Sequence, residues 1–394
     1  MAIPRTSDMD AMTSEIRAMR RHIHQHPEMA YEEHATSDLV AGKLEEWGYE
    51  VTRGVATTGV VGTLRIGSGT RRIGIRADMD ALAIHEETRL PYASAVAGTM
   101  HACGHDGHTA ILLGAAQRIA AGRNFSGTVH LYFQPAEEKG YDSGAARMIS
   151  DGLFERFPCD AVFGLHNHPG EPVGRFLFRS GPFMAASDKI VITIRGKGGH
   201  AARPHLAVDP AVVAASMVMA LQTIVSRNVN PAETAVVTVG VLHSGSANNV
   251  IANSATLELS VRSFSDAVQR QMRDRIHDIA RFQAESYGAT AEVTVLPGYP
   301  VLVNTDTETS LAVAVAKELF GDEQVDAEFE QVTASEDFAF MLQQRPGCFF
   351  RLGNGTFAES FPVHHPRYDF NDDNLSPAVA YWTRLVERFL SARD

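Results

Sequence analysis

Short apolar runs alternate with helical segments through the first half of the chain. The runs have the length and composition of buried strands and stand at residues 60–65, 72–77, 128–133 and 161–165. Two segments with helical periodicity, 108–121 and 145–151, lie among them. Apolar strands separated by helices are typical of a sheet that is buried on both faces. We therefore predict an α/β domain in which helices flank a mostly parallel sheet.

The middle of the chain has a different order of elements. The patterns run strand, helix, strand, strand, helix, strand, at residues 189–195, 209–227, 234–242, 255–264, 266–287 and 289–296. This β-α-β-β-α-β order is that of the split-βαβ, or ferredoxin-like, sandwich. Because the unit is self-contained, we predict an inserted domain at 185–296 and a discontinuous first domain formed by 1–184 and 297–394.

Length and charge limit the kinds of partner. At 394 residues the chain exceeds the size at which one core keeps growing, so two domains are expected. A formal charge of −12 disfavours nucleic acid and anionic membrane as partners, since both require clustered Lys and Arg. Residues 1–10 lack the pattern of an export signal, and no stretch approaches the roughly 18 apolar residues that span a bilayer. We expect a soluble, cytoplasmic protein that acts on a small molecule.

A cluster of potential metal ligands stands at residues 100–108. The run Met-His-Ala-Cys-Gly-His-Asp-Gly-His contains one thiol, Cys103, and three imidazoles, and the adjacent pair Glu137 and Glu138 follows later. Thiolate, imidazole and carboxylate together suit zinc, manganese, cobalt or nickel better than calcium or magnesium. With 3 cysteines in the chain, a disulfide framework is not expected.

Polar groups follow four of the predicted strands at their carboxyl ends. They are Asp78 and Asp80, then Glu137 and Glu138, then His166, and last a loop with His364 and His365. Ligands of an open parallel sheet collect outside the carboxyl ends of its strands, so one crevice could hold all of these groups. Other roles stay open, because a single His after a strand is commonly structural. For Asp80 we expect a helix-capping role.

Two adjacent carboxylates can divide the work of metal-assisted hydrolysis. In an extended chain successive side chains point in different directions, so one glutamate can bind metal while its neighbour faces the attacking water. A bound cation lowers the pKa of that water from about 16 toward about 7, and the second glutamate can pass the proton to the leaving amine. The competing chemistry is nucleophilic attack by Cys103 with His105 or His108 as base. No G-x-S-x-G or Walker motif supports a serine hydrolase or a nucleotide enzyme.

Several segments together resemble a known family. They are His-Gln-His-Pro-Glu at 24–28, Arg-Ala-Asp-Met-Asp-Ala-Leu at 76–82, the run at 100–108, Phe-Gln-Pro-Ala-Glu-Glu at 133–138, Gly-Gly-His-Ala-Ala at 198–202, Ser-Glu-Asp-Phe at 335–338 and His-His-Pro-Arg-Tyr-Asp-Phe at 364–370. The pattern resembles the amidohydrolase branch of the aminoacylase and carboxypeptidase-G metallopeptidase superfamily. That branch includes hippurate hydrolase, N-acetyl-diaminopimelate deacetylase and plant indole-acetyl-amino-acid hydrolases.

The resemblance implies a binuclear metal centre in the catalytic domain. Its ligands would be Cys103, His105, Glu138, His166 and His364, with Cys103 as the bridge. The two divalent ions in each subunit would be manganese or zinc, with cobalt or nickel as alternatives. Glu137 would be the general base and then the general acid. Asp78 would orient a ligand imidazole from outside the centre.

The resemblance also assigns the inserted domain as a lid and dimerisation domain. His200 would reach across a dimer to the other active site and stabilise the oxyanion, while Asn249 and Arg262 would hold the carboxylate of the substrate. The implied activity is hydrolysis of the amide bond of N-acyl amino acids by a homodimer or a dimer-based tetramer. The alternatives are a dipeptidase or carboxypeptidase of the same superfamily, and a non-catalytic metal-dependent binding protein.

Overall fold

The chain divides into two compact units. A computed structural model describes residues 7–391. The first unit is formed by Met1–Gly181, Val303–Glu330 and Asp337–Asp394, and the second by Pro182–Leu302 and Gln331–Glu336. The predicted domain boundaries lie a few residues away from these. The short segment Gln331–Glu336, which we had placed in the catalytic domain, belongs to the second unit.

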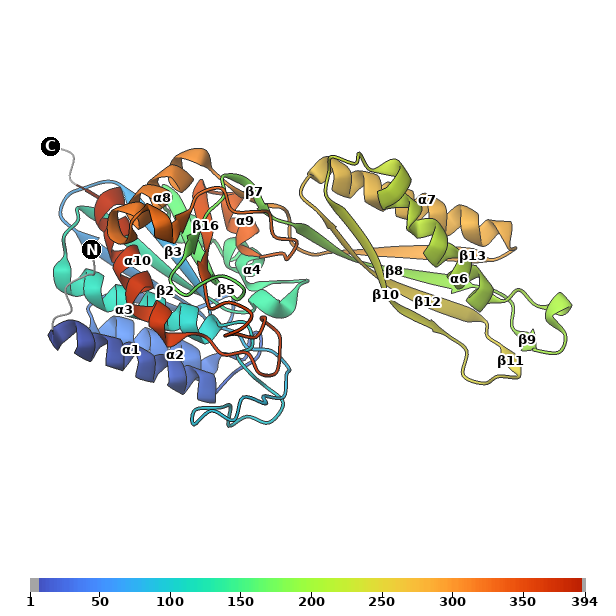
Figure 1. Cartoon of the computed structure of the whole chain (residues 1–394), viewed down its shortest axis with the longest axis horizontal. Helices are drawn as coiled ribbons and strands as arrows, with labels where there is room; N and C mark the ends of the chain where they lie inside the picture. The colour runs from blue at the N-terminus through green and yellow to red at the C-terminus, as the bar shows by residue number, and fades with distance from the viewer. Residues whose placement is uncertain (1–6, 392–394) are drawn as a thin grey trace. The chain divides into compact units, whose positions relative to one another are not determined.

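The first unit is built on an eight-stranded mixed sheet (Figure 1). Its strands are β1 (Glu50–Val55), β2 (Gly59–Ile66), β3 (Arg72–Asp78), β4 (Gly127–Gln134), β5 (Ala161–His168), β6 (Phe176–Leu177), β15 (Val325–Asp326) and β16 (Gly347–Gly353), in the order β1-β2-β4-β3-β5-β16-β6-β15. The central strands β4, β3, β5 and β16 pair in parallel, whereas β1, β2 and β4 pair antiparallel. The predicted mainly parallel centre of the sheet is confirmed.

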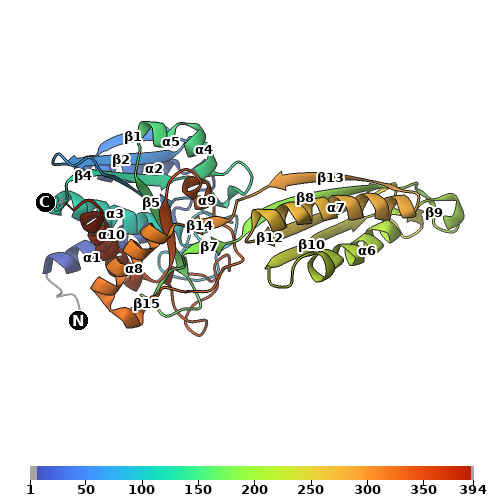
Figure 2. The same cartoon turned by 90° about the horizontal axis from the view of Figure 1, so that it is seen from above.

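Helices cover both faces of this sheet (Figure 2). One face carries α1 (Ser7–Gln25), α2 (His34–Glu46), α3 (His105–Gly122), α8 (Asp306–Phe320) and α10 (Leu375–Phe389), and the other carries α4 (Gly144–Ser150), α5 (Leu153–Arg156) and α9 (Phe338–Leu342). Aromatic rings of Phe176, Phe350, Tyr381 and Trp382 fill the space between the sheet and α10. Their burial removes large apolar areas from water and stabilises this layer.

The second unit has the predicted β-α-β-β-α-β order. Its elements are β8 (Ala186–Arg195), α6 (Pro210–Leu221), β10 (Ala235–Ser244), β12 (Ser254–Ser263), α7 (Asp266–Ser286) and β13 (Thr290–Pro297), with an antiparallel sheet in the order β10-β12-β8-β13. Both helices cover one face of the sheet (Figures 1 and 2). The α7 helix buries Val268, Met272, Ile276 and Ala280, because residues four apart share a helix face. The predicted split-βαβ fold is confirmed.

Several short elements complete the fold. They are η1 (Glu137–Lys139), η4 (Asp322–Gln324) and η5 (Asp372–Asn374) in the first unit, and β9 (Gly199–His200), η2 (Pro204–Leu206), the π-helical turn η3 (Ile224–Asn228) and β11 (Val250–Ile251) in the second. The strands β7 (Gly181–Met184) and β14 (Leu302–Asn304) lie where the chain passes from one unit to the other.

One apolar segment departs from the expectation that nothing in the chain is long and apolar enough for a bilayer. The helical segment Pro210–Asn228 is long and apolar enough to cross a membrane, judged by its length and composition alone. One side of its helix α6 packs on the sheet of the second unit through Val213, Met217 and Leu221. The side chains of Val212 and Met219 are exposed.

Candidate active site

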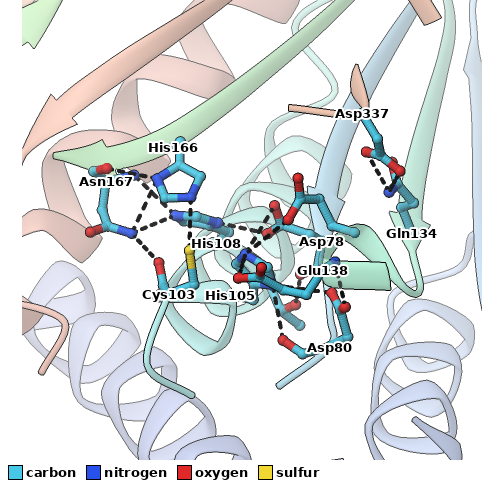
Figure 3. Close-up of polar contacts among 12 residues, drawn as sticks. Asp78, Asp80, Cys103, His105, His108, Gln134, Glu138, His166, Asn167 and Asp337 are labelled. Carbon is cyan, nitrogen blue, oxygen red and sulfur yellow. Dashed lines mark hydrogen bonds and ion pairs between the residues drawn. The ribbon is translucent and has the colours of Figure 1, made fainter. Parts of the chain in front are cut away.

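Six potential donor side chains meet at the carboxyl ends of neighbouring strands in the first unit. Glu137 and Glu138 follow β4, His166 lies near the end of β5, and His364 lies in the loop after β16. Cys103 and His105 come from the start of α3. Figure 3 shows the labelled side chains Cys103, His105, Glu138 and His166 gathered with Asp78 between these elements.

The distances join these residues into one cluster. The Sγ atom of Cys103 lies 3.3 Å from Nε2 of His166, and Nε2 of His364 lies 3.0 Å from Oε1 of Glu138. Within three groups the donor atoms all lie within 4.8 Å of one another, and these groups are Cys103 with His105 and His166, Cys103 with Glu138 and His364, and His105 with Glu137 and Glu138. Each group shares a member with another, so the three groups adjoin one another.

Left-handed backbone positions form the two turns that present these donors. Gly104, between Cys103 and His105, has φ 92°, and a Cβ atom there would lie 2.3 Å from Nδ2 of Asn167. Only glycine fits this position without a clash. The sharp turn that it permits lets the Cys103 thiol and the His105 imidazole, two residues apart, face the same point. Ala136, with φ 55°, precedes the 3₁₀ turn η1. The two glutamates therefore diverge because of a tight turn, and not because of the extended chain that we expected.

Asp80 is not the N-cap residue of a helix, because the next described helix, α3, begins only at His105. Its Oδ1 atom lies 3.1 Å from Nδ1 of His105, and its Oδ2 atom accepts a 2.9 Å hydrogen bond from the backbone N–H of Glu138. One buried carboxylate thus supports two of the predicted ligands, and it leaves Nε2 of His105 directed at the cluster.

Asp78 has a different imidazole partner from the one that we expected. Its Oδ1 atom lies 2.6 Å from Nδ1 of His108, which is not a predicted ligand, whereas its Oδ2 atom lies 3.6 Å from Nε2 of His105. Nε2 of His108 in turn accepts a 3.0 Å hydrogen bond from the backbone N–H of Asn167. Sequence reasoning missed these supporting roles of Asp80, His108 and Asn167. The spacing of His105 and His108, one helical turn apart, was the available signal for His108.

The electrostatics of the cluster favour a bound cation. Burial opposes a charge on His105, but the carboxylates of Asp78 and Asp80 outweigh it and raise its pKa to about 10. Burial and the charge of His108 lower the pKa of His166 well below its usual range, so this imidazole is neutral and can donate a lone pair. Among the described residues, Nε2 of His105 is buried and makes no hydrogen bond. A divalent cation fits both the surplus of buried carboxylate and this nitrogen, which makes no hydrogen bond.

The same field disfavours a cysteine nucleophile. Burial and the charges of Glu138 and Glu137 raise the pKa of the Cys103 thiol well above its usual range. A thiol enzyme requires the thiolate, which this environment opposes unless a cation is adjacent.

Comparison with known proteins agrees with this geometry. Residues 74–388 match the model of peptidase family M20/M25/M40. The chain belongs to this family. It is 41% identical over 388 residues to hippurate hydrolase of Campylobacter jejuni, covering 98% of this chain and 99% of that protein. It is 37% identical over 393 residues to N-acetyl-L-cysteine deacetylase of Bacillus subtilis, covering 98% and 91%.

A solved structure of the M20 family has the same fold. This dinuclear metal-binding peptidase of Bacillus subtilis is 33% identical, with a TM-score of 0.84 over 98% of this chain and 100% of that chain. The M20 chain is therefore an enzyme, a hydrolase, and its predicted resemblance to the amidohydrolase branch is confirmed.

The three predicted substrate-binding residues of the M20 chain lie in the second unit, and not in the unit that holds the donor cluster. His200 of β9 pairs with Val250 of β11, and the carbonyl of Asn249 accepts a 3.0 Å hydrogen bond from the backbone N–H of Ala201. His200 and Asn249 therefore lie side by side, with the His200 side chain exposed. Arg262 is half-buried on β12, and its Nη1 atom donates a 2.8 Å hydrogen bond to Oγ of Ser335. Burial lowers the pKa of this guanidinium.

Proposed function

We propose that this M20 enzyme is a metal-dependent amidohydrolase that cleaves the amide bond of N-acyl amino acids. The observation that carries the proposal is the buried cluster of thiol, imidazole and carboxylate donors with Glu137 beside it. The two named relatives support the substrate class, because hippurate and N-acetyl-L-cysteine are both N-acyl amino acids.

In this proposal Cys103, His105, Glu138, His166 and His364 would hold the metal ions. Cys103, His105 and Glu138 each belong to two of the three donor groups described above. Two ions that lie close together need ligands shared in this way. Manganese or zinc suits this mixed donor set. When bound, the two ions lower the pKa of a water molecule and polarise the carbonyl of the substrate.

Glu137 moves the proton. Its buried carboxylate lies 4.0 Å from Nε2 of His105, at the side of the donor cluster. From there it takes a proton from the attacking water and delivers it to the leaving amine. Asp80 and Asp78 do not touch the substrate in this scheme. They hold His105, Glu138 and His108 in place.

The second unit supplies recognition of the substrate, and we propose that it does so as a lid in a homodimer. Arg262 and Asn249 bind the carboxylate of the substrate, and His200 stabilises the oxyanion of the other subunit. The exposed apolar residues Val241 and Leu242 on the edge strand β10 support an interface between subunits. Met219 on helix α6, which packs against β10, is also exposed.

A substrate screen with matched variants tests the proposal. The purified enzyme, supplied with Mn²⁺ or Zn²⁺, is assayed with acetyl, benzoyl and indole-acetyl amino acids and with dipeptides. We expect hydrolysis of N-acyl amino acids that is lost on chelation and restored by the metal. Glu137→Gln should lower kcat by about 10²–10⁴-fold with unchanged metal content, because the residue provides general acid–base catalysis. The exposed control Glu155→Gln should keep wild-type kcat.

Two results would contradict the proposal. Cleavage of dipeptides without cleavage of any N-acyl amino acid would favour the dipeptidase alternative. Normal turnover by Glu137→Gln would remove this residue from its role.

A further inference from the structure

The turn that presents Glu137 and Glu138 is held by a buried carboxylate to which the chemistry above gives no role. Glu33 is wholly buried just before α2. Its Oε1 atom accepts a 2.9 Å hydrogen bond from the backbone N–H of Ala136, and its Oε2 atom accepts a 2.5 Å hydrogen bond from the hydroxyl of Thr58. Both oxygens thus bind neutral donors, and one of these donors is the peptide group next to Glu137.

Ala136 needs such support, because its φ of 55° is uncommon for a residue with a side chain. A conformation of this kind persists where the surrounding structure imposes it. Glu33 binds the N–H of Ala136 on one side, and the carbonyl of Ala136 accepts a 3.0 Å hydrogen bond from the N–H of Gly144 on the other. Asp80 binds the N–H of Glu138 after the turn, so these two contacts are the ones that fix the peptide just before Glu137.

Residues 28–33 make further contacts with the same part of the site. The hydroxyl of Tyr31 donates a 2.6 Å hydrogen bond to the carbonyl of Asp142, at the far end of the loop that carries Glu137. The carbonyl of Glu28 accepts a 2.8 Å hydrogen bond from the N–H of Ala81, next to Asp80. The segment 28–33 thus contacts the loop at 136–142 at both ends and also supports the backbone beside Asp80.

Burying a carboxylate completely costs desolvation free energy, which a side chain that serves only for packing would not require. Burial, and after it the negative charge of Asp80, raise the pKa of Glu33 to about 7. An apolar side chain of similar volume would avoid this desolvation. What an apolar side chain does not provide is an acceptor for the N–H of Ala136.

We propose that Glu33 is a positioning residue for the general base: its carboxylate holds the Ala136 peptide so that the Glu137 side chain points at the metal cluster. This inference rests on the proposed function in one respect, namely that Glu137 is the base. Glu33 itself touches neither substrate nor metal, so its effect falls on turnover, with little effect on the binding of either.

A pair of variants of similar volume tests the inference. Glu33→Met fills the space without accepting a hydrogen bond, whereas the amide oxygen of Glu33→Gln can still accept from Ala136. We expect Glu33→Met to lower kcat by about 10²-fold, the effect of a misplacement near 1 Å, with KM and metal content close to wild type. Glu33→Gln should recover most of this loss. Thr58→Val is the control, because it removes the other hydrogen bond of Glu33 and leaves the bond to Ala136.

A crystal structure of Glu33→Met gives a readout that does not depend on the substrate. We expect Ala136 and Glu137 to be displaced in it, whereas Glu138 stays in place because Asp80 binds its N–H. An undisplaced turn would overturn the inference, as would wild-type kcat in Glu33→Met or an equal loss in Thr58→Val. If Glu33→Met does not fold, Glu33→Ala takes its place. If the wild-type enzyme hydrolyses no N-acyl amino acid, the proposed function fails. The displacement of the turn then decides the inference about Glu33 by itself.

Discussion

The guanidinium of Arg76 joins two buried carboxylates behind the metal cluster, and its removal should destabilise the first unit severely. Nη1 of Arg76 lies 2.7 Å from Oδ2 of Asp78, and Nη2 lies 2.9 Å from Oδ1 of Asp337. Its Nε atom donates a 2.8 Å hydrogen bond to Oε1 of Gln134. Asp337 and Gln134 are also bonded to each other, as Figure 3 shows. All of these side chains are buried.

Arg76→Met keeps much of the volume but leaves two carboxylates without this cation. Breaking a buried ion pair by removing one partner costs about 3–5 kcal/mol, because the remaining charge stays in a medium of low dielectric constant. In a unit of this size each kcal/mol lowers the Tm by roughly 2 °C, so we expect a fall of about 6–10 °C. Burial already raises the pKa of Asp337, and the loss of Arg76 raises it further. The deficit should therefore shrink as the pH falls and Asp337 becomes protonated.

Scanning calorimetry of the metal-free protein at pH 7.5 and pH 5 measures this effect, and a double-mutant cycle identifies its cause. Asp337→Asn removes one of the two charges that Arg76 balances. The double variant Arg76→Met with Asp337→Asn should therefore unfold at a higher temperature than Arg76→Met alone. A fall of the Tm by less than about 2 °C in Arg76→Met, which is roughly 1 kcal/mol, would refute the reasoning. So would a double variant that is less stable than Arg76→Met.

Two further predictions follow from the contacts around the cluster. Asp80→Ala should weaken metal binding by about 10–100-fold in a metal titration, because Asp80 supports both His105 and Glu138; unchanged affinity would contradict this role. His24 is buried, and although burial opposes its charge, the carboxylate of Asp106 at 2.8 Å raises its pKa to about 9. The stability that protonated His24 contributes, at most about 3 kcal/mol, is fully present below about pH 6.5 and is lost as the pH rises through 9. Denaturant unfolding of wild type and His24→Gln should therefore differ most at pH 6 and least at pH 9.5, whereas a constant difference would argue against this ion pair.

Local sequence patterns were sufficient for the architecture and for the end of the sheet at which the donor side chains gather. Apolar runs with helices between them indicate a parallel sheet, and the carboxyl ends of parallel strands share one edge. Polar residues directly after those runs, such as Glu138 and His166, were therefore expected near one another. The order of elements in the second unit likewise determines its sandwich, since each element needs only its own periodicity to be recognised.

Only the tertiary structure decided which groups touch. Asp78 and Asp80 stand on the same side of an extended chain, so alternation along a strand cannot show that His105 lies beside Asp80 and His108 beside Asp78. The contact between Glu33 and Ala136 has no sequence signal, because it joins segments far apart in the chain. The hydrophobic periodicity of a sequence shows which face of a helix or strand a residue occupies. A hydrogen bond depends on tenths of an ångström between elements, and those distances are set when the sheet and its helices pack together.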